Sequence, residues 1–178
     1  RKKPSVVTDQ DVSAACAEIA ASIGERYSYA VQIAYAFGLR RRESLLLEFH
    51  VANKQISQSG KIDVIRGTKG GRGRSVRREI RASLVGEKLI QSVCTAFPEY
   101  RCLLLGDTYK VTSSQLSAKA LPLLKKFGIN RFHELRVAYA CRRYIEITGF
   151  EPPCNSAKRT VEAEMDRDAR AMIALELG

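Results

Sequence analysis

The sequence predicts an α+β fold in which helices dominate, a helical bundle with one small three-stranded antiparallel sheet inserted early. Apolar residues recur at helical spacing on both sides of one central stretch, and within that stretch they alternate with polar residues as in strands. A chain of 178 residues fits one domain, because by size scaling it can bury roughly 70% of its unfolded surface. We therefore predict a single domain over residues 1–178, with residues 1–8 as a linker stub.

Three helices are predicted before the sheet. Thr8 and Asp11 resemble a capping box at the start of the first. Gly24 is expected to stop the first helix. Gly38 is expected to end the second, because glycine readily takes the left-handed conformation of a helix C-terminus. The predicted ranges are about 8–24, about 26–37, and a short helix from near Arg41 that carries Leu45, Leu46 and Phe49.

Beyond Val51 the apolar spacing changes to that of strands. The residues expected on one face are Ile62 and Val64 in one strand, and Val76, Arg78 and Ile80 in the next. A weaker strand before a turn at residues 57–60 would complete the three-stranded sheet. The segment GTKGGRGR, residues 67–74, then becomes the tip of a hairpin.

Helical spacing returns after the sheet and continues to the end of the chain. The predicted helices cover about 85–97, about 113–127 with an interruption at Pro122, about 130–149, and a last helix capped by Ser156 that runs through Val161, Met165, Ala169 and Met172.

The chain is strongly basic, and this favours a nucleic-acid partner. It has 30 Lys and Arg against 19 Asp and Glu, a net charge of +11. Cations that neutralise phosphates release condensed counterions, which drives binding to DNA. The basic residues cluster between positions 66 and 81, where Arg66, Lys69, Arg72, Arg74, Arg77, Arg78 and Arg81 face one acid, Glu79.

The composition argues against several other classes of protein. No apolar run is long enough to cross a bilayer, and RKKPS at the start is not followed by the apolar stretch of a secretory signal. Five cysteines without a CxxC pair or neighbouring His residues indicate reduced thiols in a cytoplasmic protein. We predict no metal site and no cofactor.

Four local features could carry chemistry: GLRRRE at 38–43, Lys69 on the hairpin, HELR at 133–136, and ALELG at 174–178. Each has a structural explanation by itself. An acid such as Glu43 is favoured in a first helical turn, and His133 and Arg136 could be an ordinary polar pair on one helix face. Lys69 could be a solvated tip residue, part of a phosphate-binding loop, or a flexible catalytic acid. A Walker-type loop is excluded, because GTKGGRGR lacks the GxxxxGK[ST] spacing and leads into a strand.

Taken together and in this order, the four features resemble the catalytic domain of the tyrosine recombinase (phage integrase) family. The resemblance covers nearly the whole chain, from KPSVVTDQDV to Gly178. It implies that Arg40 and Arg136 are the two catalytic arginines, Lys69 the hairpin lysine, and His133 the residue at the His/Lys position. Glu43 matches the acid that supports the first arginine. Contacts to the DNA backbone are expected from Arg41, Arg42, Arg72, Arg74 and Arg131.

The family cleaves and rejoins double-stranded DNA through a 3′-phosphotyrosine intermediate, and this chemistry explains the residue types. Two guanidiniums can hold the nonbridging oxygens of the phosphate with paired hydrogen bonds, as lysine cannot. A lysine on a flexible tip can protonate the departing 5′ oxygen. His133 would assist proton transfer or bind a nonbridging oxygen. No metal is required, because the arginines supply the charge that Mg²⁺ supplies in many nucleases.

The nucleophilic tyrosine of the family is not present in this chain. In the family the LG is followed by a His, then by a His or Trp, and then by the tyrosine, whereas this sequence stops at Gly178. The tyrosines present all lie upstream: Tyr27, Tyr29, Tyr35, Tyr100, Tyr109, Tyr139 and Tyr144. We therefore expect a portion of a longer protein that lacks its N-terminal core-binding domain and its C-terminal nucleophile segment, and that is inactive alone.

The resemblance also implies partners and a setting. The longer protein would be a homotetramer on DNA, whereas this portion alone could be a monomer. No membrane is involved. A cytoplasmic, nucleoid-associated protein from a bacterium, a phage or another mobile genetic element is expected.

Two rival functions remain. One is a recombinase-like module that has lost catalysis and only binds DNA. The other is a helix-turn-helix regulator. Such a protein needs a recognition helix after a tight turn, and the segment KKFGINRFHELRVAYACRR could imitate one. The regulator hypothesis leaves GLRRRE and the lysine hairpin unexplained.

Overall fold

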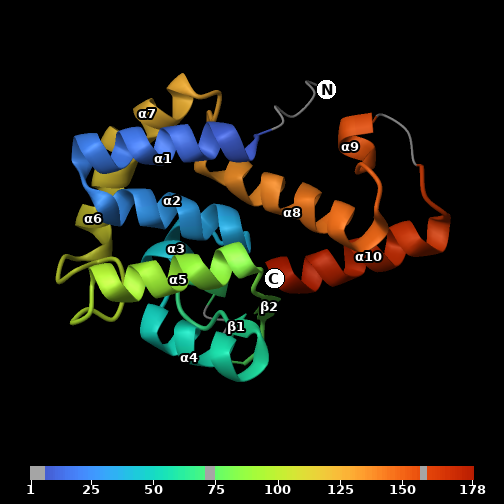
Figure 1. Ribbon diagram of the computed structural model, residues 1–178, viewed down its shortest axis with the longest axis horizontal. Helices are drawn as coiled ribbons and strands as arrows, with labels where there is room; N and C mark the ends of the chain where they lie inside the picture. Colours follow the sequence, from blue (N-terminus) through green and yellow to red (C-terminus); the bar gives the residue numbers. More distant parts are fainter. Residues whose placement is uncertain (1–6, 71–74, 157–159) are drawn as a thin grey trace.

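Helices make up most of the chain, and a two-stranded hairpin lies between the fourth and fifth of them (Figure 1). The computed structural model describes residues 7–70, 75–156 and 160–178. Its helices are α1 (Asp9–Ile23), α2 (Glu25–Phe37), α3 (Arg41–Leu46), α4 (Phe49–Ser59), α5 (Leu84–Ala96), α6 (Tyr109–Gln115), the π-helix η2 (Leu116–Ala120), α7 (Leu121–Lys126), α8 (Phe132–Thr148), α9 (Pro153–Ser156) and α10 (Ala163–Leu177). The prediction of a mostly helical α+β fold is confirmed.

The prediction of a three-stranded sheet was wrong. Over the described residues the sheet consists of β1 (Lys61–Asp63) and β2 (Glu79–Arg81), which are antiparallel with Ile62 opposite Ile80. The stretch that was expected to give the third strand is helix α4 instead. Phe49, Ala52 and Ile56 are all buried, and their spacing is that of one helical face rather than of a strand.

The start and end signals of the first two helices act as predicted. The Thr8 side chain accepts from the Asp11 N–H, and the Asp11 carboxylate accepts from the Thr8 N–H. Gly38 ends α2 in the left-handed conformation, with φ of 63°. The predicted third helix is two elements, because α3 ends at Leu46 and α4 begins only at Phe49.

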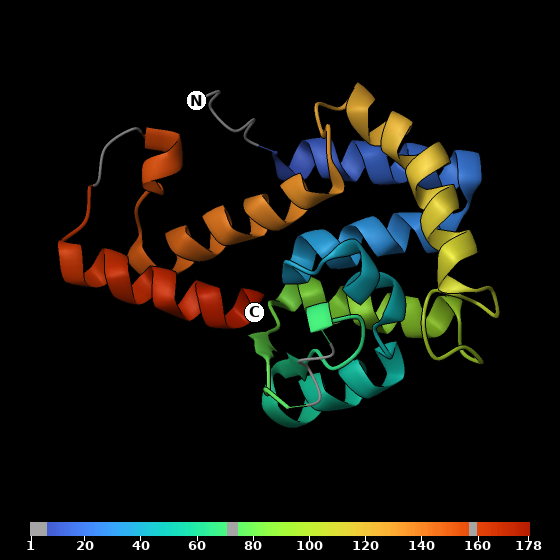
Figure 2. The same ribbon diagram turned by 180° about the vertical axis from the view of Figure 1, so that it is seen from behind.

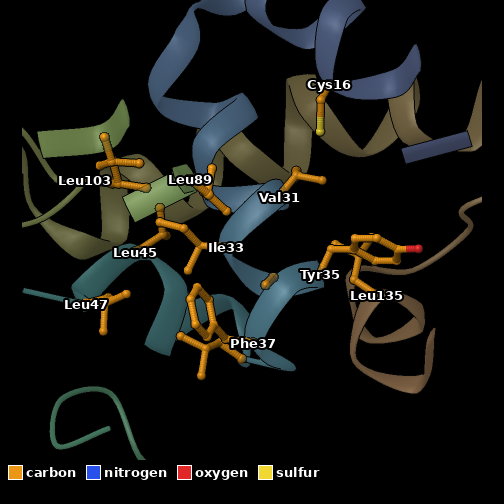
Figure 3. Close-up of a cluster of buried hydrophobic side chains, with 14 of the residues drawn as sticks. Cys16, Val31, Ile33, Tyr35, Phe37, Leu45, Leu47, Leu89, Leu103 and Leu135 are labelled. Carbon is orange, nitrogen blue, oxygen red and sulfur yellow. The ribbon is translucent and has the colours of Figure 1, made fainter. Parts of the chain in front are cut away.

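Helix α2 is the centre of the main hydrophobic core. It packs against α1, α3, α5 and α8, and its residues Val31, Ile33 and Phe37 are fully buried (Figure 3). Leu45 of α3 and Leu135 of α8 are buried in the same cluster. The core therefore joins α3 to the start of α8.

Two C-terminal elements differ from their predicted limits. The chain passes from α6 through η2 into α7 without leaving the helical conformation, and Pro122 lies in the first turn of α7, where its missing N–H is tolerated. Ser156 does not cap the last helix, because it belongs to the short α9 and α10 begins at Ala163.

The end of α10 lies at the centre of the molecule. Helix α10 packs along α8, and its last residues reach strand β2 (Figures 1 and 2). Tyr144, Val161, Ala169 and Ile173 form a smaller second core between these helices. None of the helices that the structure describes is both long and apolar enough to cross a membrane.

Candidate functional site

A buried glutamate, Glu43, is surrounded by three arginines from three different parts of the fold. Glu43 Oε1 accepts from Arg40 Nη1 at 2.8 Å and from Arg78 Nη1 at 2.8 Å. Its Oε2 accepts from the Arg40 main-chain N–H at 2.8 Å and lies 3.9 Å from Arg136 Nη1. We call Arg40, Arg78, Arg136 and Glu43 the arginine cluster.

The turn between α2 and α3 places Arg40 and Glu43. Arg40 lies at the N-terminus of α3, and Glu43, in the first turn, reaches back to it. The Gly38 carbonyl accepts from Arg136 Nη1 at 2.8 Å. A Cβ at Gly38 would lie 2.5 Å from Tyr139 Cδ1, so glycine allows this turn to approach α8. The GLRRRE motif is therefore a turn that carries Arg40 and packs against α8, the helix that carries Arg136.

The last turn of α10 closes the arginine cluster from the other side. Each arginine donates to a different main-chain oxygen: Arg78 Nε to Glu176 at 2.7 Å, Arg136 Nη2 to Leu177, and Arg40 Nη2 to Gly178 at 2.7 Å. All three arginines of the cluster therefore bind the same short stretch of main chain.

The cluster carries more positive than negative charge. Burial, followed by the charges of Arg40 and Arg78, lowers the pKa of Arg136 to about 10. Burial also lowers the pKa of Arg78, against the attraction of Glu43. Both guanidiniums stay protonated at neutral pH. With three guanidiniums around one carboxylate, the cluster is suited to binding a further anion.

The other two predicted catalytic residues, Lys69 and His133, are not members of this cluster. Lys69 is exposed on the loop after β1, and His133 is exposed in the first turn of α8. Across the described residues, no hydrogen bond or ion pair links either side chain to the arginine cluster. His133 and Arg136 both line an open cavity of about 590 Å³ between α8, α9 and α10.

The loop that carries Lys69 packs against the beginning of α3. Gly67 has a φ of 81°, and a Cβ there would lie 2.9 Å from the carbonyl oxygen of Arg42. Only a glycine fits this contact without displacing main chain. The contact holds the base of the lysine loop beside α3, which begins directly after Arg40 and carries Glu43 in its first turn.

The arginines predicted to contact DNA are exposed where the structure describes them. Arg41 Nη1 donates to Ser117 Oγ at 2.5 Å, and the Arg42 guanidinium lies 5.2 Å from the centre of the Tyr109 ring. Arg131 is exposed just before α8. Arg72 and Arg74 lie outside the described residues.

Sequence reasoning missed Arg78 as a member of the cluster. One signal was present: in the predicted strand Arg78 falls on the same face as Ile80, which is fully buried. An arginine at an inward position requires a buried partner. The partner, Glu43, is far away in the sequence and could not be identified from the strand pattern alone. Within the described ranges, no group of three or more His, Cys, Asp or Glu residues could hold a metal ion.

Comparison with known proteins identifies the family. A family model described as integrase matches residues 5–142, a range that includes GLRRRE, the lysine hairpin and HELR. No curated protein and no solved structure matches the chain. The family supports a function in DNA integration or recombination, with DNA as the substrate. Because this match covers most of the sequence and includes Arg40, Glu43, Arg78 and Arg136, the chain belongs to the integrase family, as a tyrosine-recombinase-like domain.

Proposed function

We propose that the arginine cluster binds the scissile phosphate of double-stranded DNA, and that the protein performs site-specific recombination through a 3′-phosphotyrosine intermediate. The observation that carries this proposal is the convergence of Arg40 and Arg136 on the Glu43 carboxylate. Strand displacement at a phosphodiester places negative charge on two nonbridging oxygens, and charge-assisted bonds from two fixed guanidiniums stabilise it.

Glu43 and Gly38 would hold the two arginines ready before the DNA arrives. Glu43 binds both the main-chain N–H and the side chain of Arg40, and the Gly38 carbonyl binds Arg136. Donors that are oriented in advance need no reorganisation during the reaction. Glu43 is thus a supporting residue rather than a phosphate ligand.

On binding, the phosphate would replace the main-chain oxygens at the end of α10 as the partner of Arg40 and Arg136. Arg40 donates to the Gly178 oxygen and Arg136 to the Leu177 carbonyl. The Arg136 side chain is only 9% exposed, so the phosphate would reach it when Leu177 gives up its hydrogen bond. The Leu177 and Gly178 oxygens would then give way to the phosphate, whereas the Glu176 carbonyl would stay bound to Arg78.

Lys69 would act as the general acid that protonates the 5′ oxygen. Its side chain is exposed, and Gly67 and Gly70 on either side of it both have positive φ. His133, one turn before Arg136 on α8, would bind a nonbridging oxygen or assist proton transfer. Arg41, Arg42, Arg72, Arg74 and Arg131 would bind the DNA backbone.

The proposal includes a longer protein. Residues 1–178 would form its catalytic domain, preceded by a core-binding domain and followed by a segment with the nucleophilic tyrosine, and four copies would assemble on DNA. A reading frame that continues past Gly178 into a His and then a Tyr would support this. A complete frame without such a Tyr would instead favour a binding module.

The decisive experiment compares Lys69→Ala with Lys61→Ala in the longer protein. Lys61 is an exposed lysine of the same hairpin that pairs with Glu79 at 3.0 Å, so it is a matched control. We expect Lys69→Ala to slow cleavage of a nicked duplex by about 10²–10⁴-fold at saturating DNA, with little change in Kd. Lys61→Ala should retain the wild-type rate. Equal losses of rate and affinity in Lys69→Ala would mean that Lys69 is only an anchor.

One observation favours a second candidate, a binding module without catalysis. The outer donors of Arg40 and Arg136 are already used by main-chain oxygens of α10. If this arrangement persists on DNA, the arginines only hold the fold together at a basic surface. Arg40→Ala would then cost at most one phosphate contact, and no variant or wild-type protein would form a covalent DNA adduct.

A further inference from the structure

Arg78 is the one member of the arginine cluster to which the proposed phosphate chemistry gives no role. Its side chain is only 5% exposed, and it binds Glu43 and the Glu176 carbonyl inside the protein. The neighbouring Arg77 has the same charge but a side chain that is 76% exposed, with surface ion pairs to Asp63 and Glu79. The two consecutive arginines thus lie in opposite environments.

The Arg78 side chain joins two elements that are distant in the sequence. Its Nη1 donates to Glu43 Oε1 at 2.8 Å, and its Nε donates to the Glu176 carbonyl of α10 at 2.7 Å. The α10 end packs directly on it, because a Cβ at Gly178 would lie 2.8 Å from Arg78 Cδ. The Arg78 guanidinium therefore binds both Glu43, which holds Arg40, and the end of α10, which contacts all three arginines.

The main chain of Arg78 is fixed within the hairpin. Its N–H donates to Asp63 Oδ1 at 3.2 Å, and its carbonyl accepts from the Val64 N–H at 3.0 Å. Asp63 ends β1, and the loop with Lys69 follows it. The hairpin that carries Lys69 is therefore connected through Arg78 to Glu43 and to α10.

We infer that Arg78 is a positioning residue that holds the last turn of α10 and the hairpin against Glu43, so that Arg40, Arg136 and Lys69 share one fixed geometry. This role rests on the proposed function for its catalytic consequence. It requires arginine, because two acceptors in different directions need Nε and Nη1 at once, and lysine has one nitrogen.

The first test measures hydrogen exchange in the chain without DNA, comparing Arg78→Met with Arg77→Met. Both changes remove one positive charge from adjacent positions. We expect Arg78→Met to accelerate amide exchange in the last turn of α10 by at least about fivefold, because that turn loses its anchor. Arg77→Met should leave it unchanged. The same exchange rate in both variants would overturn the inference, whether or not the protein cleaves DNA.

Arg78→Lys separates geometry from charge. It keeps the cation but cannot bind Glu43 and Glu176 together, so we expect faster exchange at the α10 end here too. A wild-type rate in Arg78→Lys would show that charge alone suffices and would also overturn the inference. If Arg78→Met does not fold, judged by its thermal unfolding, the lysine variant carries the comparison.

The second test measures cleavage of a nicked duplex by the longer protein. Misplacement of reacting groups by about 1 Å can cost about 100-fold in rate, so we expect Arg78→Met to lower the rate at saturating DNA by roughly 10–100-fold with Kd nearly unchanged. An unchanged rate, or a loss of affinity equal to the loss of rate, would contradict a positioning role in the reaction. Failure of the wild-type protein to cleave would refute the proposed function, and the exchange comparison would still decide whether Arg78 holds α10.

Discussion

Glu43 is a carboxylate with no exposure to solvent, and it binds donors from two arginines on two different elements. Three guanidiniums would repel one another at this position without it, and burial of Arg78 and Arg136 strengthens the repulsion. Its position in the first turn of α3 also satisfies the Arg40 N–H. One side chain therefore combines a helix-capping role with charge compensation in the arginine cluster.

Glu43→Gln should destabilise the fold strongly. The substitution preserves the size of the side chain but leaves buried guanidiniums without a counter-charge, which typically costs about 3–5 kcal/mol. Denaturant unfolding measures the loss. Glu79→Gln is the control, because Glu79 is a partly exposed acid that binds Lys61 and Arg77, and surface pairs contribute only about 0–1 kcal/mol. Similar losses in both variants would argue against a special role for Glu43.

At the scale of elements, the site depends on close approach at turns. The α2–α3 turn contacts α8 through Gly38, and the hairpin loop contacts α3 through Gly67. Both glycines have positive φ and too little space for a Cβ. The elements that carry Arg40, Lys69 and Arg136 are therefore held at distances that a larger residue would increase.

Gly38→Ala should destabilise the protein more than Gly60→Ala. Gly38 and Gly60 end α2 and α4 with φ of 63° and 69°, so alanine would suffer the same left-handed strain at both, about 1–2 kcal/mol. Nothing lies within 4 Å of a Cβ at Gly60, whereas at Gly38 it would overlap the Tyr139 ring. We expect Gly38→Ala to cost about 1–3 kcal/mol more, measured by thermal unfolding. Equal losses would mean that Tyr139 moves freely away.

At the scale of the whole molecule, two hydrophobic cores meet at the arginine cluster. The larger core surrounds α2, and the smaller one lies between α8 and α10. The end of α10 points back into the molecule toward β2 (Figure 2), and Leu177 near this end packs against both cores. Positive charge therefore gathers where three parts of the fold meet, in a chain whose net charge is +11.

DNA binding by this chain should weaken steeply with salt. Each phosphate neutralised contributes about −0.9 to the slope of log K against log salt, and we expect a slope of about −3 to −6 for a duplex of unrelated sequence, measured by fluorescence anisotropy. Changing Arg41 and Arg42 together to Gln should reduce the slope by about 2. Arg167→Gln removes an exposed arginine of α10 that pairs with Glu164 and Asp168, and should have little effect. A slope independent of Arg41 and Arg42 would place the DNA on another surface.

Several features could be predicted from local sequence because their physical causes are local. The cap at Thr8, the glycine that ends α2, and the apolar stripes of α2, α5 and α8 need only neighbouring residues. Part of the α4 helix was mistaken for a strand because its buried face has few apolar residues. These residues were assigned to the alternating strand pattern that follows in the sequence. The order of the motifs was sufficient to indicate the family, since each motif keeps its place along the chain.

By itself, then, the sequence determined the helical class, most helix limits, the basic character and the family. Only the tertiary structure decided that Arg78 joins the cluster and that α10 ends on its three guanidiniums. The physical reason is that a buried charge is paired by whichever partner the packing brings near, and for Arg78 these are Glu43 and the Glu176 carbonyl, both far from it along the chain. Local spacing carries no record of such a contact.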